Sequence, residues 1–179
     1  MIILASGSPR RRELIKKITS DFTVIPADVD ESIIHVPACD LPGELSKMKA
    51  YDVFQKYPND KVLACDTVVI IDGEVLGKPH TKEKAFEMLK KLSGRKHVVI
   101  SGYTLISKEK EITRTVRTYV YFNKLSDELI NKYIETGSPM DKAGAYGIQD
   151  SEFDLVNHIE GSFDNVIGLP TEDLKAHWF

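Results

Sequence analysis

Hydrophobic and polar residues follow two different periods along the chain, and these periods predict which segments are helices and which are strands. Apolar residues recur every three or four positions in four segments that are bounded by capping or helix-breaking residues. We expect helices at about 9–19, 44–57, 82–92 and 127–136, with a short helix near the C-terminal end. Continuous or alternating apolar runs predict strands at 1–5, 22–26, 62–71, 97–106, 111–122 and 153–159.

The first strand runs directly into Ser6-Gly7-Ser8-Pro9 and then into a helix, an arrangement that forms binding sites for phosphate. Pro9 suits the first helical position because it has no N–H to lose, so Ser8 is the expected N-cap. The free backbone N–H groups of the first helical turn then favour an anion. Ser6 and Ser8 are therefore candidate phosphate-binding residues.

Arg11 lies near the centre of the apolar stripe that Leu14, Ile15 and Ile18 form, whereas Arg10 and Arg12 flank the stripe. A guanidinium on a buried helix face needs an anionic partner. The alternative is a basic surface helix on which Arg11 extends its charged end over the core into water. Together with the preceding serines, Arg11 favours a polyphosphate site.

A second cation and a carboxylate also fall on positions that should face inward. Lys49 lies one helical turn from both Leu45 and Val53. The strand expected at 62–71 is apolar nearly throughout, as in strands that are covered on both faces, but Asp66 and Thr67 interrupt it. A carboxylate inside such a strand is costly unless it is paired or bound to a metal.

Asp72-Gly73 predicts a tight hairpin turn, which returns the chain towards Lys78. In the ideal register Thr67 pairs with Lys78, and strand alternation then places Asp66 and Lys78 on opposite faces. We expect the two charges to converge only if the ladder contains a bulge or the strand ends near Gly77.

The segment 138–149 is rich in small residues and has no hydrophobic period, so we expect a loop whose backbone approaches a ligand closely. Lys142, a candidate substrate-binding residue, and Gln149 belong to this segment.

Composition limits the classes of protein to consider. A length of 179 residues suits one domain, which we expect to have two lobes, and a net charge of −3 argues against nucleic acid as a partner. The chain shows neither a basic leader segment nor an apolar run of about 18 residues, so we expect a cytoplasmic protein without membrane association. Cys39, Cys65 and five single histidines have no metal-like spacing, which predicts reduced thiols and no zinc site.

The inward carboxylates and cations together suit metal-assisted attack on a phosphate ester. Carboxylates such as Glu31 and Asp66 hold Mg²⁺ and orient a water molecule, and cations such as Lys49 and Lys78 neutralise charge on phosphoryl oxygens. Each residue also has a simpler explanation. Glu31 suits a solvated turn, the two lysines suit solvent-directed side chains, and Asp66 suits half of a buried ion pair.

The ordered motifs of nearly the whole chain resemble the Maf family of nucleoside triphosphate pyrophosphatases, which share a fold with inosine triphosphatases. The motifs are Leu4-Ala-Ser-Gly-Ser-Pro-Arg-Arg11, Asp28-Val-Asp-Glu31, Lys49-Ala50, Asp66-Thr-Val-Val69, Gly77-Lys-Pro79, Leu92-Ser-Gly-Arg95, Asp141-Lys-Ala-Gly-Ala-Tyr-Gly-Ile-Gln149, Ile159-Glu-Gly-Ser162 and Asn165-Val-Ile-Gly-Leu-Pro170.

This resemblance implies an α/β fold in which helices flank an elongated mixed sheet, with two lobes and a central cleft for the nucleotide. It implies hydrolysis of a nucleoside triphosphate to the monophosphate and pyrophosphate with a divalent metal, Mg²⁺ or Mn²⁺, bound by Glu31 and Asp66. Asp66 is the implied catalytic base, and a homodimer is expected.

The branch of the family that the chain resembles acts on dTTP and UTP, and the positions tied to base choice match Arg10, Thr67 and Gln149. A glutamine amide suits these bases because it can pair with both the N3–H donor and the neighbouring carbonyl acceptor. Asp150 is a departure from the family pattern, in which glycine often follows the glutamine, and so is Ser46-Lys47, which stands where Ala-Arg is common.

A non-catalytic nucleotide-binding regulator, linked to septum formation, is the alternative function. Pure binding gives no reason to keep a carboxylate in a buried strand beside phosphate. P-loop and Rossmann enzymes are disfavoured because Lys78 lacks the upstream glycine of a P-loop and no G-x-G-x-x-G opens a helix.

Overall fold

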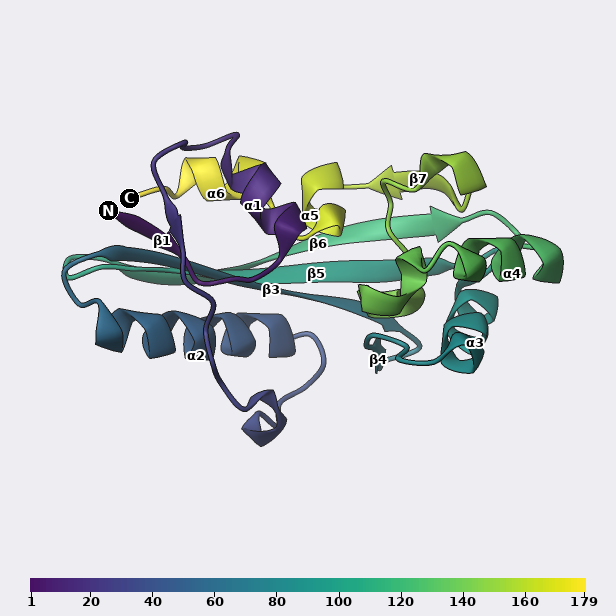
Figure 1. The fold of residues 1–179 in the computed structure, drawn as a ribbon, viewed down its shortest axis with the longest axis horizontal. Coiled ribbons are helices and arrows are strands. Elements are labelled where there is room, and N and C mark those ends of the chain that lie inside the picture. Colours follow the sequence, from purple (N-terminus) through teal and green to yellow (C-terminus); the bar gives the residue numbers. More distant parts are fainter. The chain divides into compact units, whose positions relative to one another are not determined.

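The computed structural model describes residues 1–179 and contains a seven-stranded mixed sheet flanked by helices, which confirms the predicted fold class (Figure 1). The strands are β1 (Ile2–Leu4), β2 (Thr23–Val24), β3 (Lys61–Ile71), β4 (Glu74–Leu76), β5 (Lys96–Ile106), β6 (Glu111–Phe122) and β7 (Val156–Glu160). The helices are α1 (Pro9–Ile15), α2 (Leu41–Lys56), α3 (Lys82–Leu92), α4 (Asp127–Glu135), α5 (Phe163–Ile167) and α6 (Thr171–Ala176).

The sheet order is β2-β1-β3-β5-β6-β7, and β4 pairs with β3 off this path. β1 runs parallel to both β2 and β3, whereas the β3–β4 and β6–β7 pairs are antiparallel. The chain divides into two compact units. The first contains residues 1–67, 100–116 and 164–179, and the second contains residues 68–99 and 117–163.

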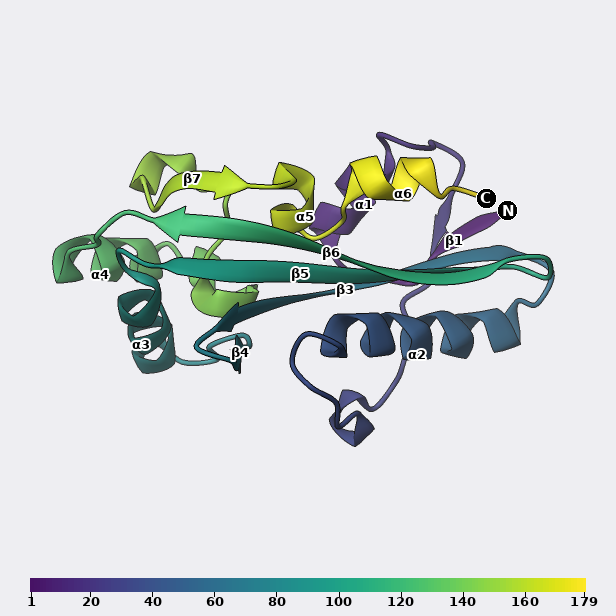
Figure 2. The ribbon, with the colours of Figure 1, turned by 180° about the vertical axis from the view of Figure 1, so that it is seen from behind.

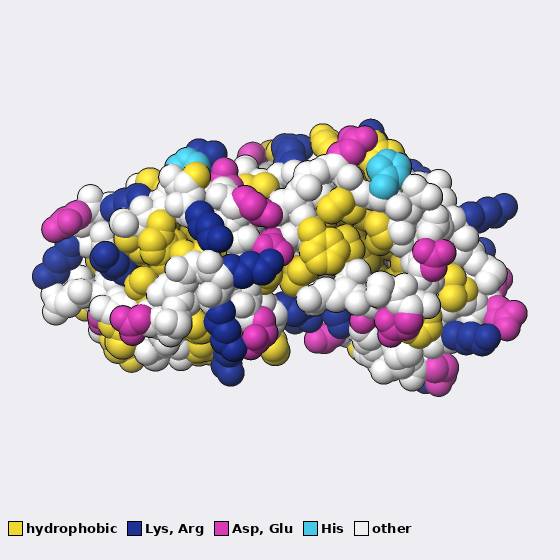
Figure 3. All heavy atoms as spheres, turned by 90° about the horizontal axis from the view of Figure 1, so that it is seen from above, with side chains coloured by type: hydrophobic (Ala, Val, Ile, Leu, Met, Phe, Trp, Pro, Cys, Tyr) yellow, Lys and Arg dark blue, Asp and Glu magenta, His cyan; other side chains and the backbone are white.

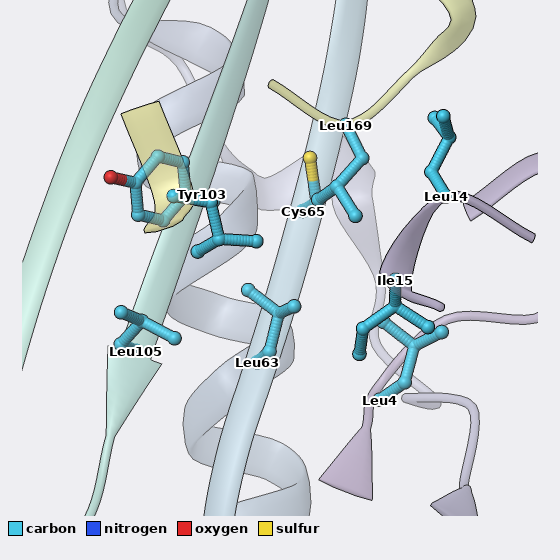
Figure 4. Packing of buried hydrophobic residues seen from close by; sticks show 9 residues of the cluster. Leu4, Leu14, Ile15, Leu63, Cys65, Tyr103, Leu105 and Leu169 are labelled. Atoms are coloured by element: carbon cyan, nitrogen blue, oxygen red, sulfur yellow. The ribbon is translucent and has the colours of Figure 1, made fainter. Parts of the chain in front are cut away.

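In the first unit, helices cover both faces of the sheet. Figures 1 and 2 show α2 along one face and α1 with α6 on the other. Successive β3 residues alternate between the two layers: Leu63 and Cys65 belong to the core cluster beneath α1 and α6, and Val62 and Ala64 belong to the cluster beneath α2. Figure 4 shows the first cluster, with Ile15 of α1 beside Leu4 of β1. Burial on both faces explains why β3 is apolar nearly throughout.

Helix α2 begins three residues before the predicted start, at Leu41, because Pro42 and Gly43 form its first turn instead of preceding it. Proline is tolerated there because the N–H groups of the first turn have no intrahelical acceptor. The first turn packs directly on β5. A Cβ added to Gly102 would lie 2.4 Å from the backbone nitrogen of Gly43, so only glycine allows this approach.

The second unit contains the predicted hairpin and two packed helices. Asp72 and Gly73 have positive φ angles and join β3 to β4 in the register that the sequence predicts, with Val69 opposite Leu76. From the sequence, Asp66 and Lys78 can converge only if the ladder contains a bulge or the strand ends near Gly77. The strand β4 ends at Leu76, so the second condition is met and Lys78 lies beyond the ladder. Thr81 and Ser126 cap α3 and α4 as predicted, and these helices pack against each other.

Two segments of the C-terminal part differ from the sequence expectation. The predicted strand at 153–159 begins at Val156, because residues 151–153 form a 3₁₀ turn and Asp154 adopts a left-handed conformation that ends this turn. Helix α5 falls where a loop was expected. It has only five residues, too few for a hydrophobic period to be visible in the sequence.

No helix combines the length and the apolar character that crossing a membrane requires. On the face shown in Figure 3, acidic and basic side chains are interspersed.

Candidate active site

Arg11 points inward from α1, as its place on the apolar stripe predicted. Its side chain donates from Nε to the carbonyl of Gly168 at 2.8 Å, from one terminal nitrogen to Oγ of Ser6 at 3.3 Å, and from the other to Oγ1 of Thr67 at 3.1 Å. All three acceptors are neutral oxygens. The positive charge of Arg11 is therefore held in place without a carboxylate that would neutralise it, which leaves it available to an anionic ligand.

The hydroxyl groups that hold Arg11 are themselves fixed. Oγ1 of Thr67 lies 2.7 Å from Oγ of Ser101, and the Ser101 hydroxyl donates to the carbonyl of Asn165 at 3.2 Å. Ser101 is fully buried. This chain of hydrogen bonds joins α1, β3, β5 and α5 within the first unit, so it orients Arg11 through groups that cannot move independently.

The serines of the first turn lie where the sequence predicted. Ser8 is the N-cap of α1, and its side chain accepts from the backbone N–H of Arg11 at 3.4 Å. Oγ of Ser6 is buried and accepts from the N–H of Ser8 at 3.2 Å as well as from Arg11. Arg10 lies half-buried on the same helix, next to Arg11.

Three charged side chains meet on the α2 side of β3. Nζ of Lys49 lies 2.9 Å from Oδ1 of Asp66 and 2.8 Å from Oε1 of Glu31. Lys49 and Asp66 are largely buried, with side-chain exposures of 16% and 13%, whereas Glu31 is half exposed at 51%. Helix α2 provides the lysine, β3 provides the aspartate and a 3₁₀ turn at Glu31–Ile33 provides the glutamate.

The two carboxylates set the charge state of Lys49. Burial alone would lower the pKa of the ammonium group, but Asp66 and then Glu31 outweigh that effect and raise the pKa of Lys49 above its ordinary value. Lys49 is therefore a permanent cation at neutral pH. It uses Oδ1 of Asp66, and Oδ2 of this carboxylate has no partner within the protein.

Asp66 and Thr67 are neighbours in β3, and strand alternation sends them to opposite faces of the sheet. Asp66 joins Lys49 on the α2 side, and Thr67 joins Arg11 on the α1 side. The last hydrogen bond from β1 to β3 runs from the N–H of Ala5 to the carbonyl of Leu63. Beyond it β3 continues without β1, so the two polar positions begin just past the carboxyl end of β1, a usual place for ligands in α/β proteins.

Glu31 and Asp66 fit a hard divalent cation. Both carboxylates already converge on one positive charge, that of Lys49, and no group of three or more metal-binding side chains occurs in the chain. Two carboxylates suit Mg²⁺, which takes only one or two from a protein and completes its octahedron with water and substrate phosphates. They do not suit structural zinc, which requires four protein ligands that include cysteine or histidine.

The remaining predicted residues belong to the second unit. Lys78 is exposed just after β4. Nζ of Lys142 donates within its own loop, to the carbonyl of Ser138 at 2.7 Å, to Oγ of Ser138 at 3.0 Å and to Asp141 at 3.1 Å. Gln149 is exposed and its side chain makes no hydrogen bond. The assignments of Lys78, Lys142 and Gln149 to substrate stay predictions.

Two residues of the Arg11 network were missed by sequence reasoning. Ser101 was visible only as a polar residue in an apolar strand, a weak signal. Gly168 stood in a motif that resembles the family, but nothing in its spacing pointed to Arg11, which is 157 residues away in the chain. Its carbonyl also accepts from the buried thiol of Cys65 at 3.3 Å, and burial raises the pKa of that thiol, so Cys65 is structural and unreactive.

Comparison with known proteins shows the family of the chain. A protein-family profile described as "Maf-like protein" matches residues 1–177. The dTTP/UTP pyrophosphatase of Thermococcus gammatolerans is 47% identical over 172 residues, which cover 96% of this chain and 92% of the relative. The enzymes of the same name from Thermosipho africanus and Pyrococcus furiosus are 49% and 46% identical, and their alignments cover 94% of this chain and 87% and 89% of those proteins.

Among solved structures, the Ham1 protein of Staphylococcus aureus matches 70% of this chain and 72% of its own, with a TM-score of 0.50 at 18% identity. At this identity the likeness shows the fold alone. It confirms the expected relation to the inosine triphosphatase-like architecture.

Proposed function

The chain belongs to the Maf-like protein family, and we propose that it hydrolyses dTTP and UTP to the nucleoside monophosphate and pyrophosphate. The full-length likeness to several dTTP/UTP pyrophosphatases supports this activity. The structural observation that carries the proposal is the state of Asp66. Its carboxylate is largely buried, one oxygen is held by Lys49, and the other has no protein partner and is available to a water molecule.

In the proposed reaction, Asp66 takes a proton from water while the water oxygen forms a bond to the α-phosphorus. The bond between that phosphorus and the oxygen bridging to the β-phosphate breaks, and pyrophosphate leaves. Lys49 orients the base through the bond to Oδ1. Lys49 also pairs with Glu31, so one ammonium group holds both carboxylates on the α2 side of β3.

We assign Arg11 to binding the phosphate groups of the nucleotide. It presents a charge without a carboxylate partner, at a position fixed by Ser6, Thr67 and Gly168. A fixed guanidinium stabilises charge that develops on phosphoryl oxygens better than a mobile one, because no free energy is spent on ordering it during the reaction. A divalent metal, held by Glu31 and Asp66, would supply further neutralisation of phosphate charge when bound.

The proposal extends to the setting of the reaction. We expect a cytoplasmic enzyme without nucleic-acid or membrane partners, and a homodimer as in the sequence expectation. The net charge of −3 supports the expectation of no nucleic-acid partner, since such a partner would favour a basic protein.

The test is a panel of eight nucleoside triphosphates, the four ribonucleotides and the four deoxynucleotides. Pyrophosphate release is measured for each in Mg²⁺, in Mn²⁺ and in EDTA. We expect the highest kcat/KM with dTTP and UTP. Tight binding of these nucleotides without pyrophosphate release would instead identify a nucleotide-binding regulator and contradict the proposal.

A further inference from the structure

A hydrogen-bonded network in the second unit fixes the loop that carries Gln149. Its centre is the carboxylate of Asp150, whose Oδ2 accepts from the hydroxyl of Tyr133 at 2.5 Å and from the hydroxyl of Ser138 at 2.6 Å. The Tyr133 oxygen in turn accepts from the backbone N–H of Gly147 at 2.9 Å. The two ends of the turn 147–150 are thus tied to the same phenol.

The network is built on rigid parts of the unit. Tyr133 is fully buried in α4, where its ring also contacts Phe153. Ser138 receives a hydrogen bond from Nζ of Lys142 at 3.0 Å, so the ammonium group extends the network to the start of the loop. The carbonyl of Gly147 accepts from the N–H of Asp150 at 3.0 Å and closes the turn.

The side chains of the network pack closely beside Gly147. A Cβ added there would lie 2.9 Å from Cε of Lys142 and 3.2 Å from Oδ2 of Asp150. The side chains of Lys142 and Asp150 therefore occupy the space beside the turn, and a larger residue at position 147 would have to displace the end of the Lys142 side chain.

Gln149, unlike its neighbours Gly147 and Asp150, takes no part in this network. It is exposed, and its amide makes no hydrogen bond, although its neighbours on both sides of the turn are bonded. A glutamine that served to hold the loop would use its amide on the backbone. In this protein Asp150 has that structural role, which leaves the amide of Gln149 free for a ligand.

We propose that Asp150 and Tyr133 are positioning residues that hold the turn 147–150, so that the amide of Gln149 is presented to the pyrimidine base in one orientation. This inference rests on the proposed function, since it assigns base selectivity to the same enzyme. The reason is entropic: a bidentate contact from a preorganised amide does not have to meet the cost of ordering a mobile loop when the nucleotide binds.

The geometry distinguishes two substitutions of Asp150. Both hydrogen bonds reach the same oxygen, Oδ2, so Asp150→Asn can keep them with its amide oxygen, whereas Asp150→Ala loses both. Tyr133→Phe removes the donor to Asp150 and the acceptor of the Gly147 N–H together.

We expect Asp150→Ala and Tyr133→Phe each to lower kcat/KM for UTP by about threefold to tenfold, the range for a lost hydrogen bond, with a smaller loss for CTP. Asp150→Asn should restore most of the UTP-to-CTP ratio. Because Asp150 and Tyr133 belong to one hydrogen-bonded network, kcat/KM for UTP should be little lower in the double variant than in either single variant. Amide hydrogen exchange at Gly147 should be faster in Asp150→Ala and Tyr133→Phe than in wild type. This measurement does not depend on enzyme activity.

The matched control is Tyr121→Phe, which removes another phenol-to-carboxylate hydrogen bond of the same unit, from Tyr121 to Glu160 at 3.1 Å. It should change neither the UTP-to-CTP ratio nor exchange at Gly147. An equal loss for all nucleotides in Asp150→Ala and Tyr133→Phe, or no loss at all, would overturn the positioning role while the proposed function stands. A wild-type protein that does not hydrolyse dTTP or UTP would overturn both. Should Asp150→Ala not fold, Tyr133→Phe decides alone.

Discussion

The ammonium group of Lys49 lies 2.9 Å from Oδ1 of Asp66, and this ion pair joins the middle of α2 to the polar pair that interrupts the apolar strand β3. Here one oxygen stays without a protein partner. The pair therefore holds the carboxylate and leaves half of it for chemistry.

Asp66→Asn keeps the shape of this side chain but removes its charge and its capacity to take a proton. We expect kcat for dTTP and UTP to fall by about 10² or more, with KM much less affected. Steady-state kinetics with the purified variant measure both. Glu44→Gln is the matched control, because it removes a carboxylate that pairs with a lysine on the exposed side of α2. Near-normal turnover by Asp66→Asn would rule out the assignment of the base.

Arg11→Ala tests the phosphate site. Hydrogen bonds to charged groups are worth about 1.5 to 3 kcal/mol, so nucleotide affinity should weaken by about tenfold to a hundredfold. Isothermal titration with a non-hydrolysable UTP analogue measures the Kd. Arg12→Ala is the control, since Arg12 is exposed on the same helix. If Arg11→Ala lowers only the melting temperature and leaves the Kd unchanged, Arg11 is a structural residue.

The proposed metal requirement rests on Glu31 and Asp66 as hard oxygen ligands. Mg²⁺ or Mn²⁺ should support turnover, and the purified protein should carry no tightly bound zinc. Glu31→Gln should raise the Mg²⁺ concentration for half-maximal activity by about tenfold, because one charged ligand is lost. Activity that persists in full after exhaustive EDTA treatment would contradict the metal role.

Local patterns were enough to predict which charged residues of the first unit face inward. Arg11 and Lys49 fall on apolar helix stripes and Asp66 interrupts an apolar strand, and each of these signals depends only on residues within a few positions. The structure confirms all three inward positions.

The partners of these residues could not be predicted in the same way, because they come from distant parts of the chain. Ser101 contacts Thr67 from the neighbouring strand β5, and Gly168 contacts Arg11 from the C-terminal segment. The choice between the two faces of β3 also depends on register. Strand alternation alone gives Asp66 and Thr67 opposite faces, but only the cores beneath α2 and α1 show which face each residue takes.

His97 should make the protein less stable in acid. It is buried, its Nε2 lies 2.7 Å from the hydroxyl of Tyr146, and its Nδ1 has no hydrogen-bond partner. Burial lowers the pKa of His97 from 6.5 to about 4. The unfolded chain therefore binds a proton between these values and the folded protein does not, so the free energy of unfolding falls as the pH drops from about 6.5 to about 4.

The expected loss across that range is about 3 kcal/mol, from about 1.4 kcal/mol for each pKa unit. Urea unfolding of wild type and His97→Gln, at several pH values between 4 and 8, measures it. The variant is less stable at pH 8 in any case, so the comparison concerns the slope. An equal slope in both proteins would assign the acid sensitivity to other groups.

The last prediction concerns base selectivity and Gln149. If its amide reads the N3–H and O4 edge of the base, Gln149→Glu removes the donor to O4 and places a carboxylate beside that oxygen, while the N3–H can still be accepted. Cytosine has an amino donor at C4, so CTP should be less affected by the substitution.

For Gln149→Glu, we expect kcat/KM for dTTP and UTP to fall by about tenfold or more, within the roughly 1 to 3 kcal/mol of a bidentate base contact, and their advantage over CTP to narrow. Competition assays with UTP and CTP in one reaction measure this ratio directly. An unchanged ratio, with all nucleotides slowed alike, would mean that Gln149 only supports the loop, a role for which its exposed, unbonded amide is poorly suited.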